Sequence, residues 1–125
     1  MYVLVNHHID AGNHGELSAL ILMKKSVWDQ VVGQTYSGCI GKYGEFTGTV
    51  GSTEHEDFET WKVTELTLFQ VVVLSTIFGF EVNKLTDTIY KSEIRETVVP
   101  HVTLSGYCPL YNIHWDDDEE DEYGY

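Results

Sequence analysis

Apolar and polar side chains follow one another along the first part of the chain in a pattern that is typical of strands. Residues 2–9 are rich in β-branched and aromatic side chains, and residues 10–15 are rich in turn formers. This pattern predicts an N-terminal strand followed by a loop.

The next apolar run can be interpreted in two ways. Residues 17–23 have strand length, and Ser26 can cap a short helix over residues 27–32 that ends at Gly33. A single helix over residues 16–32 is the alternative, which the length of the segment favours. We prefer the division into a strand and a helix.

The middle of the chain is rich in glycine. Aromatic and β-branched side chains lie between the glycines, which predicts short strands and tight turns in an antiparallel hairpin with bulges. Residues 52–59 are polar and acidic and predict an exposed loop. The six glycines are Gly33, Gly38, Gly41, Gly44, Gly48 and Gly51.

The longest apolar segment, residues 66–80, predicts the central core element. Thr64 is a candidate N-cap and Gly79 a candidate stop. The triplet at residues 71–73 consists of valines, which favour strands, but the segment is long and shows no polar stripe. It is predicted to be a buried helix.

The last part of the body mixes two patterns. Tyr90, Ile94 and Val98 recur at helical spacing, so residues 86–97 predict a surface helix. Residues 98–114 return to strand-like composition, broken by Pro100, Gly106 and Pro109.

These elements predict the α+β class, because strands and helices mix without strict alternation. We expect residues 1–115 to form one small domain, mostly antiparallel sheet with one buried helix and one or two surface helices. With 42% hydrophobic residues, this part can bury a core. Residues 116–125 are expected to be a disordered acidic tail, because adjacent like charges repel and cannot be buried unpaired.

The net charge of −13 restricts the possible partners. The tail holds seven of the 20 acidic residues, so residues 1–115 carry 13 acids against seven bases, a net charge of −6. Body and tail therefore share a sign, and the tail has no basic groove on its own domain to occupy. Direct binding to nucleic acid is disfavoured, since it requires clustered Lys and Arg.

The cysteine content and the hydropathy of the chain indicate its cellular location. The chain has two cysteines, Cys39 and Cys108, and lacks a basic N-terminal region with a cleavage site. One disulfide is possible, but two free thiols in the cytoplasm are favoured. The apolar run at residues 66–80 is shorter than the about 20 residues that a membrane span needs, so no membrane insertion is predicted.

The segment around Gly41, Lys42 and Tyr43 invites comparison with a phosphate-binding loop. Such a loop places Ser or Thr after Gly-Lys, where this chain has Tyr43, and Tyr36 stands where its first glycine would be needed. The match fails. A small anion would be bound by Lys42 and the nearby backbone N–H groups.

No sequence motif indicates a metal site or a catalytic site. The six histidines have no helical HxxxH or CxxC partner, and His7 and His8 point to opposite faces of a strand. His7 or His8 together with His14 is the conceivable pair. Cys39 lies among glycines, but a packed core residue explains it equally well. No catalytic residue, metal or cofactor is predicted, and an enzyme is less favoured than a binding protein.

The acidic segments are the candidate partner-binding residues. Carboxylates give long-range attraction to a basic surface, and the flanking aromatic rings can supply binding energy. The turn contributes Glu54, Glu56 and Asp57, and the tail contributes Trp115, Asp116, Asp117, Asp118, Glu119, Glu120, Asp121, Glu122, Tyr123 and Tyr125.

The sequence therefore predicts a small acidic cytoplasmic protein that binds a basic protein surface. Its target would be a nucleic-acid enzyme, inhibited by occlusion or DNA mimicry as small phage-encoded viral inhibitors do, an analogy of class only. A solubilising tail explains the charges almost as well. The alternatives are a nucleotide- or ligand-binding domain built on the glycine-rich hairpin and a homo-oligomeric structural subunit.

Overall fold

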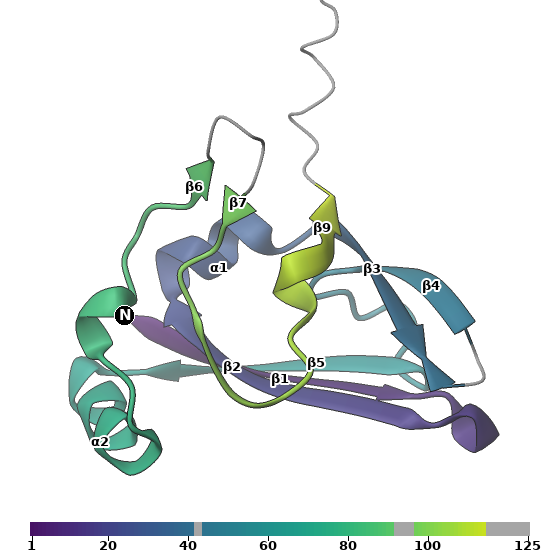
Figure 1. Cartoon of the computed structure of the whole chain (residues 1–125), viewed down its shortest axis with the longest axis horizontal. Coiled ribbons are helices and arrows are strands. Elements are labelled where there is room, and N and C mark those ends of the chain that lie inside the picture. The colour runs from purple at the N-terminus through teal and green to yellow at the C-terminus, as the bar shows by residue number, and fades with distance from the viewer. Residues whose placement is uncertain (42–43, 92–96, 115–125) are drawn as a thin grey trace, which may run out of the picture.

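The longest strands pair into a four-stranded antiparallel sheet in the order β5-β1-β2-β8 (Figure 1). β1 (Tyr2–Asp10) lies between β2 (Glu16–Lys24) and β5 (Glu59–Leu66), and β8 (Val102–Gly106) pairs with the other edge of β2. The predicted N-terminal strand is confirmed, and the loop after it contains the short 3-10 helix η1 (Gly12–His14). This computed structural model describes residues 1–41, 44–91 and 97–114.

The division of residues 16–32 into a strand and a helix is confirmed. All nine residues of β2 pair with β1, so the sheet satisfies backbone groups that a single helix would have bonded internally. The helix α1 (Lys25–Val31) follows directly. The predicted cap is wrong, because Lys24 is the N-cap residue and the Ser26 hydroxyl instead donates to Asp87 Oδ1 at 3.0 Å.

A second antiparallel sheet, in the order β4-β3-β9, contains the glycine-rich hairpin. β3 (Thr35–Ile40) and β4 (Gly44–Thr49) pair in constant register, so the predicted bulges are wrong. The 3-10 helix η4 (Pro109–Asn112) is followed directly by β9 (Ile113–His114), which pairs with the other edge of β3. A register shift is found in the first sheet instead, between Leu20 and Ile21 of β2, where this strand pairs with β8.

Two glycines of this hairpin are explained by aromatic rings that lie over them. Gly48 pairs with Tyr36, and a Cβ at Gly48 would come within 2.7 Å of the Tyr36 ring. Gly38 pairs with Phe46, whose ring would overlap a Cβ at Gly38. The two rings meet edge to face with centroids 5.9 Å apart. The missing side chains therefore make room for aromatic packing.

The two faces of the four-stranded sheet are covered to different extents. On one face, the β3–β4 hairpin and α1 close the larger core, which includes Val3, Val5, Ile21 and Trp61. On the other face, α2 (Leu68–Phe78) covers one end of the sheet. The smaller core there consists of Tyr2, Leu22, Leu66, Val71 and Leu85.

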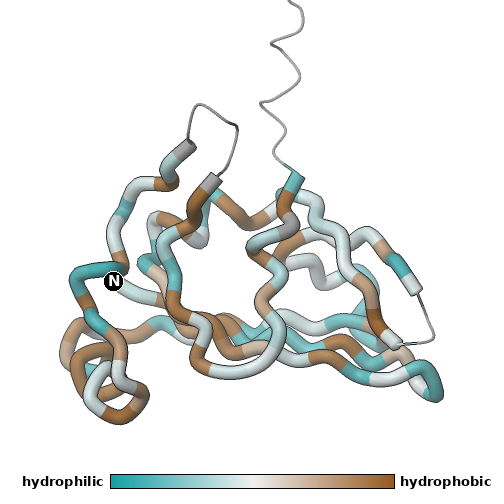
Figure 2. Tube along the Cα trace, in the orientation of Figure 1, coloured by the Kyte–Doolittle hydropathy of each residue, from teal (hydrophilic) through white to brown (hydrophobic). Residues whose placement is uncertain are grey.

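The helix predicted over residues 66–80 exists, but its predicted burial is wrong. Thr64 belongs to β5, and Thr67 is the N-cap in a reciprocal capping box with Gln70. Gly79 ends the helix in the left-handed conformation, as predicted. Val71 is its one buried residue, and the tube in Figure 2 is strongly hydrophobic along most of α2.

The surface helix predicted over residues 86–97 is wrong for its described residues, 86–91 and 97, which are not helical, and residues 92–96 lie outside the described residues. After the 3-10 helix η3 (Val82–Lys84), Tyr90–Lys91 form β6, which pairs with Thr97–Val98 as β7. Tyr90 and Val98 are direct partners across β6 and β7, so they lie on one face of a hairpin, which explains why their spacing resembles that of a helix.

The predicted α+β class with mainly antiparallel sheet is confirmed. Within the part of the chain that the structure describes, no helix is long and apolar enough to cross a membrane.

Candidate functional site

The predicted acidic contact residues divide into two groups. Trp115 and the tail, residues 116–125, lie outside the described residues. Glu54, Glu56 and Asp57 are all exposed in the turn between β4 and β5. Their binding to a basic surface stays a prediction. Glu59, which was predicted to share this exposed loop, is instead a buried residue at the start of β5.

The predicted anion-binding segment is described only at its first residue. Lys42 and Tyr43 lie outside the described residues. Gly41 has a φ of 43°, and a Cβ there would overlap the backbone carbonyl oxygen of His14. This glycine is therefore required by the close approach of the hairpin to η1.

A buried polar cluster joins three residues that are distant in sequence. Nε2 of His7 lies 2.7 Å from Oε2 of Glu59, and the hydroxyl of Tyr36 donates to the same oxygen. His7 also stacks on Trp61, with ring centroids 3.7 Å apart. Burial and the adjacent carboxylate raise the pKa of Tyr36, so its hydroxyl remains protonated and donates.

This cluster has the residue types of a catalytic site but the placement of a core network. His7 is 1% exposed, Glu59 6% and Tyr36 0%, so no substrate atom can reach the three side chains in this structure. A buried charge or polar group is stable when every partner is satisfied, which is what this arrangement provides. We assign it a structural role in joining β1, β3 and β5.

A cysteine and a histidine also lie together near β8. Nδ1 of His101 lies 2.6 Å from the carbonyl oxygen of Val99 and so carries the proton, which leaves Nε2 facing Cys108 Sγ at 3.5 Å. Burial lowers the pKa of His101 and raises the pKa of the Cys108 thiol. Both groups are therefore neutral. Because a nucleophilic cysteine needs its thiolate, this pair is a packed thiol with a hydrogen-bonded imidazole.

One set of side chains in the described chain could hold a metal ion. His8 and Asp10 on β1 and Glu16 on β2 offer ligand atoms that all lie within 4.8 Å of one another. Asp10 and Glu16 are paired residues, and His8 is two positions before Asp10 on the same face. His8 is partly buried and both carboxylates are exposed. A nitrogen and two oxygens suit a divalent transition metal, but the donor atoms are the only feature that indicates one.

The most unusual surface of the molecule is the exposed side of α2. Six of its apolar side chains are between 41% and 75% exposed. Soluble proteins seldom leave such a continuous apolar area uncovered, and a helix that is hydrophobic all round is normally buried. We call these residues the α2 surface: Leu68, Phe69, Val72, Val73, Ile77 and Phe78.

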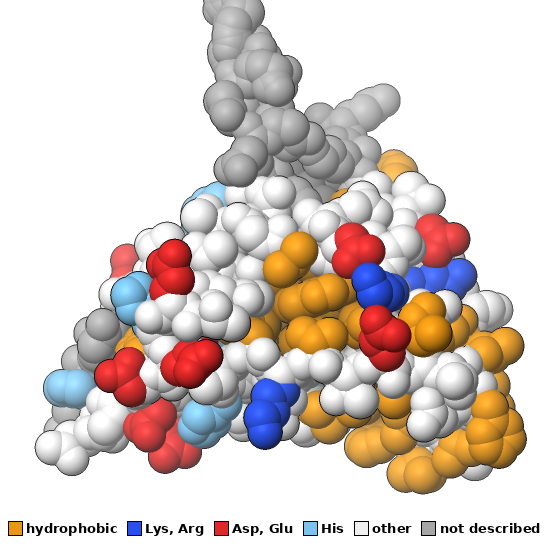
Figure 3. Space-filling view, turned by 180° about the vertical axis from the view of Figure 1, so that it is seen from behind, with side chains coloured by type: hydrophobic (Ala, Val, Ile, Leu, Met, Phe, Trp, Pro, Cys, Tyr) orange, Lys and Arg blue, Asp and Glu red, His pale blue; other side chains and the backbone are white. Residues whose placement is uncertain are grey.

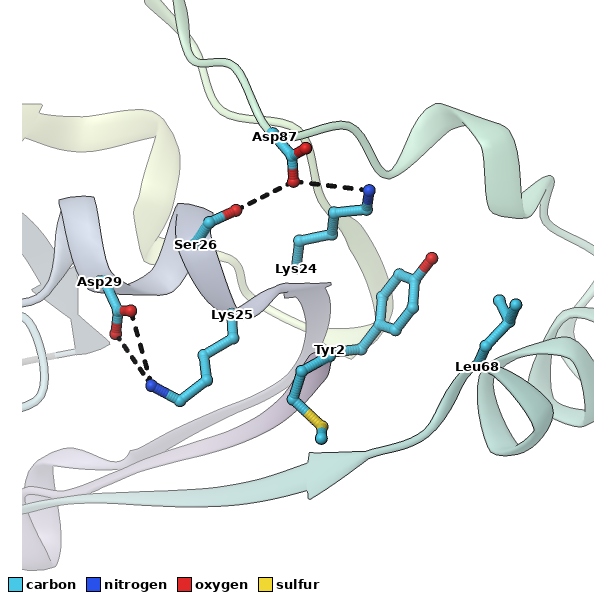
Figure 4. A pocket seen from close by; sticks show the side chains of 8 residues that line it. Tyr2, Lys24, Lys25, Ser26, Asp29, Leu68 and Asp87 are labelled. Carbon is cyan, nitrogen blue, oxygen red and sulfur yellow. Dashed lines mark hydrogen bonds and ion pairs between the residues drawn. The ribbon is translucent and has the colours of Figure 1, made fainter.

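A cleft of about 520 Å³ lies at the first turn of α2 (Figure 4). Leu68 and Tyr2 line one side, and the start of α1 lines the other. Its two lysines are neutralised locally, because Lys24 pairs with Asp87 at 3.4 Å and Lys25 with Asp29 at 3.5 Å. The cleft is therefore balanced in charge and lined more by apolar than by polar atoms, and it shares Leu68 with the α2 surface.

Figure 3 shows apolar side chains gathered at one end of the sheet and a group of acidic side chains at the other, with further acidic side chains next to lysines near the apolar end. α2 covers the end where β1 begins, whereas Asp10 and Glu16 lie at the other end with the turn that carries Glu54 and Glu56. The backbone of Asp10 donates to Phe58 O at 2.8 Å, which brings that turn against β1. Nine residues of β1 separate the ends by about 25 Å.

Comparisons with protein-family models, curated proteins and solved structures find no match to this chain. Its function must therefore be inferred from the fold and its surfaces.

The sequence indicated α2 but not its exposure. The segment contains no charged residue from Leu68 to Phe78, and that absence was interpreted as a sign of burial within the domain. It is equally a sign of burial against a second molecule. The His7–Glu59 pair was missed, although His7 occupies a core position in the alternation of Val3, Val5 and Ile9.

Proposed function

We propose that this protein is a binding protein whose principal contact surface is α2. The observation that carries the proposal is the exposure of the six apolar side chains of the α2 surface on a helix with no charged residue. Full burial of a fully exposed Phe, Leu, Ile or Val is worth about 1.5–3 kcal/mol. These side chains are 41–75% exposed and contribute a corresponding fraction each, so together they can supply the core of an interface.

The helix is stabilised by its own ends and needs no partner to form. Thr67 Oγ1 accepts from the backbone of Gln70 at 3.3 Å, and Gln70 Oε1 accepts from the backbone of Thr67 at 2.8 Å. The left-handed Gly79 donates its N–H to Ser75 O at 2.8 Å. Because the helix is already formed before binding, little free energy is lost in ordering its backbone, which favours a stable complex.

A protein partner fits this surface better than a lipid bilayer does. Helices that lie on membranes carry Lys and Arg on a polar face opposite the apolar one, and α2 has neither. The net charge of −13 also opposes approach to anionic lipid.

Photo-crosslinking from position 69 tests the proposal directly. Phe69 is replaced by a photo-reactive phenylalanine analogue in the full chain, produced in its native cells. Because Phe69 is 75% exposed, the most exposed side chain of the α2 surface, illumination should yield a discrete protein adduct. Tyr111 is the matched control, since it is aromatic, 76% exposed and lies on η4, away from α2 (Figure 1).

Equal labelling from both positions, adducts with lipid alone, or no adduct from position 69 would each contradict the proposal.

The predicted binding of a basic surface is a second candidate contact for the same protein. The exposure of Glu54, Glu56 and Asp57 at the end opposite α2 supports it. Inhibition of a nucleic-acid enzyme, DNA mimicry and a viral origin stay predictions within this second candidate. The cytoplasmic location is also part of the proposal, and the free thiols of Cys39 and Cys108 are compatible with it.

Deletion of residues 116–125 removes part of the candidate acidic contact and leaves the α2 surface unchanged in sequence, so it tests the acidic contact alone. We expect the truncated chain to keep its unfolding midpoint and to lose affinity for a polylysine-coated surface, because seven carboxylates are removed. The difference between the two chains should be large at about 0.05 M salt and small at about 0.5 M, where screening is strong. Equal binding by both chains at low salt would remove the tail from the proposal.

A further inference from the structure

We infer that the partner of α2 is a second copy of this chain, an inference that rests on the proposed role of α2 as a protein contact. Two copies of a chain with a net charge of −13 repel one another wherever their acidic surfaces approach. The α2 surface is the place where this repulsion is smallest. It contains no charged side chain. The exposed acidic residues that flank it in the chain, Glu65 and Glu81, each lie three residues from a lysine, Lys62 and Lys84, and Asp87 is paired with Lys24. The acidic residues around Asp10, Glu16 and Glu54 lie at the opposite end of the sheet.

The distance between the acidic end and α2 is long compared with the range of electrostatic repulsion in salt solution. The acidic end lies about 25 Å from α2 along β1, and the Debye length at physiological ionic strength is about 8 Å. In a dimer joined through α2, the two acidic ends point away from each other and are separated by about twice that length. Their repulsion is then almost completely screened.

The polar side chains of α2 are also compatible with an identical apolar partner. The hydroxyls of Ser75 and Thr76 donate to the carbonyl oxygen of Val72 at 2.6 Å and 3.2 Å. Gln70 is engaged in the capping box with Thr67. Because these groups already have partners within the helix, the α2 surface can be buried without leaving their hydrogen bonds unmade.

A twofold arrangement follows from this self-complementarity. In a closed dimer the same patch contacts itself, so two antiparallel copies of α2 pack their apolar side chains against each other. The cleft beside Leu68 and Tyr2 extends the contact and can receive a side chain from the end of the partner's helix. The six exposed side chains of each copy present several hundred Å² of apolar surface, enough for a small interface once the cleft is included.

A head-to-tail arrangement fits the charges less well. It would place the acidic end of one copy against the cleft of the next, and it would generate rings or open filaments in place of a dimer. The cleft lysines are already paired with Asp87 and Asp29, so they offer little net positive charge to such a contact.

Sedimentation equilibrium of the full chain from about 1 µM to about 1 mM tests the inference. We expect a monomer–dimer equilibrium. The double variant Phe69→Ser/Ile77→Ser should raise the dissociation constant at least about 30-fold, because it removes the two most exposed side chains of the α2 surface. Tyr111→Ser, at equal exposure outside α2, should leave it unchanged. Circular dichroism of the variants shows that each has kept its fold.

Salt distinguishes the two arrangements. Raising it from about 0.05 M to about 1 M should leave the dimer unchanged or strengthen it, because the contact is uncharged and the copies repel. Dissociation by salt, growth beyond the dimer, or a dimer that survives the double variant would overturn the inference. A monomer at every concentration would overturn it as well.

The crosslinking experiment keeps the inference separate from the proposed function. An adduct from position 69 with the mass of two chains supports both. A monomer whose position 69 crosslinks to a different protein overturns the second copy and leaves the protein-binding function in place. A monomer without any adduct overturns both.

Discussion

Replacing Glu59 by Ala is expected to destabilise the fold by about 3–5 kcal/mol, the cost of breaking a buried pair by removing one partner. In this structure Glu59 Oε2 accepts from His7 and from Tyr36, so the variant removes the acceptor that they share and leaves the Tyr36 hydroxyl and His7 Nε2, 3.3 Å apart, with only each other. That is a large part of the about 5–15 kcal/mol that stabilises a domain of this size. Urea denaturation followed by circular dichroism measures the change.

Two further variants show whether the loss comes from the network. Glu59→Gln keeps the shape and one carbonyl acceptor, so it should lose less, about 1–3 kcal/mol. Glu56→Ala removes an exposed carboxylate from the neighbouring turn and should change stability by less than about 0.5 kcal/mol. If Glu59→Ala were as stable as Glu56→Ala, the buried cluster would not hold the three strands together.

Replacing Gly106 by Ala is expected to be the most disruptive change to β8. The residue has a φ of 83°, which costs about 1–2 kcal/mol for a residue with a Cβ. The new Cβ would also overlap the carbonyl oxygen of Ser18 and lie 2.8 Å from Cα of Ala19, both backbone atoms of β2. Because backbone cannot move aside as a side chain can, we expect about 1–3 kcal/mol more from overpacking.

Gly79 provides a matched control for this experiment. Its φ of 79° is almost the same, but a Cβ there would meet no atom within 4 Å. Gly79→Ala should therefore show the conformational cost alone, and the difference between the two variants in thermal unfolding isolates the contact with β2. Equal losses would show that β8 can separate from Ser18 and Ala19 without cost.

The sequence was informative wherever a local pattern determines the structure. The strand at residues 2–9 and the stop at Gly79 depend on alternation and on backbone conformation, which are properties of neighbouring residues. The helical spacing of Tyr90 and Val98 gave a wrong prediction because the two residues are paired across β6 and β7, which places them on one face of a hairpin. Only pairing partners distinguish the two structures, and a single sequence does not reveal them.

The candidate contact surface shows a different limit. The apolar character of residues 66–80 indicates that they must be covered, but it does not indicate by what. In this fold α2 lies over one end of one face of the sheet, where Val71 packs against Tyr2, Leu22 and Leu66. The Glu59–His7 contact spans 52 residues and depends on the register of β1 with β5, which no local pattern contains.

The attachment of α2 has a consequence for how the protein can change. Its caps lie within residues 67–79, and Val71 is the one residue of the helix that is buried in the domain. The exposed residues of the helix can therefore be substituted without altering the strands against which it packs. Chains with this framework could exchange one binding specificity for another by substitutions in three turns of helix, and a designer could use the same three turns as a graft site.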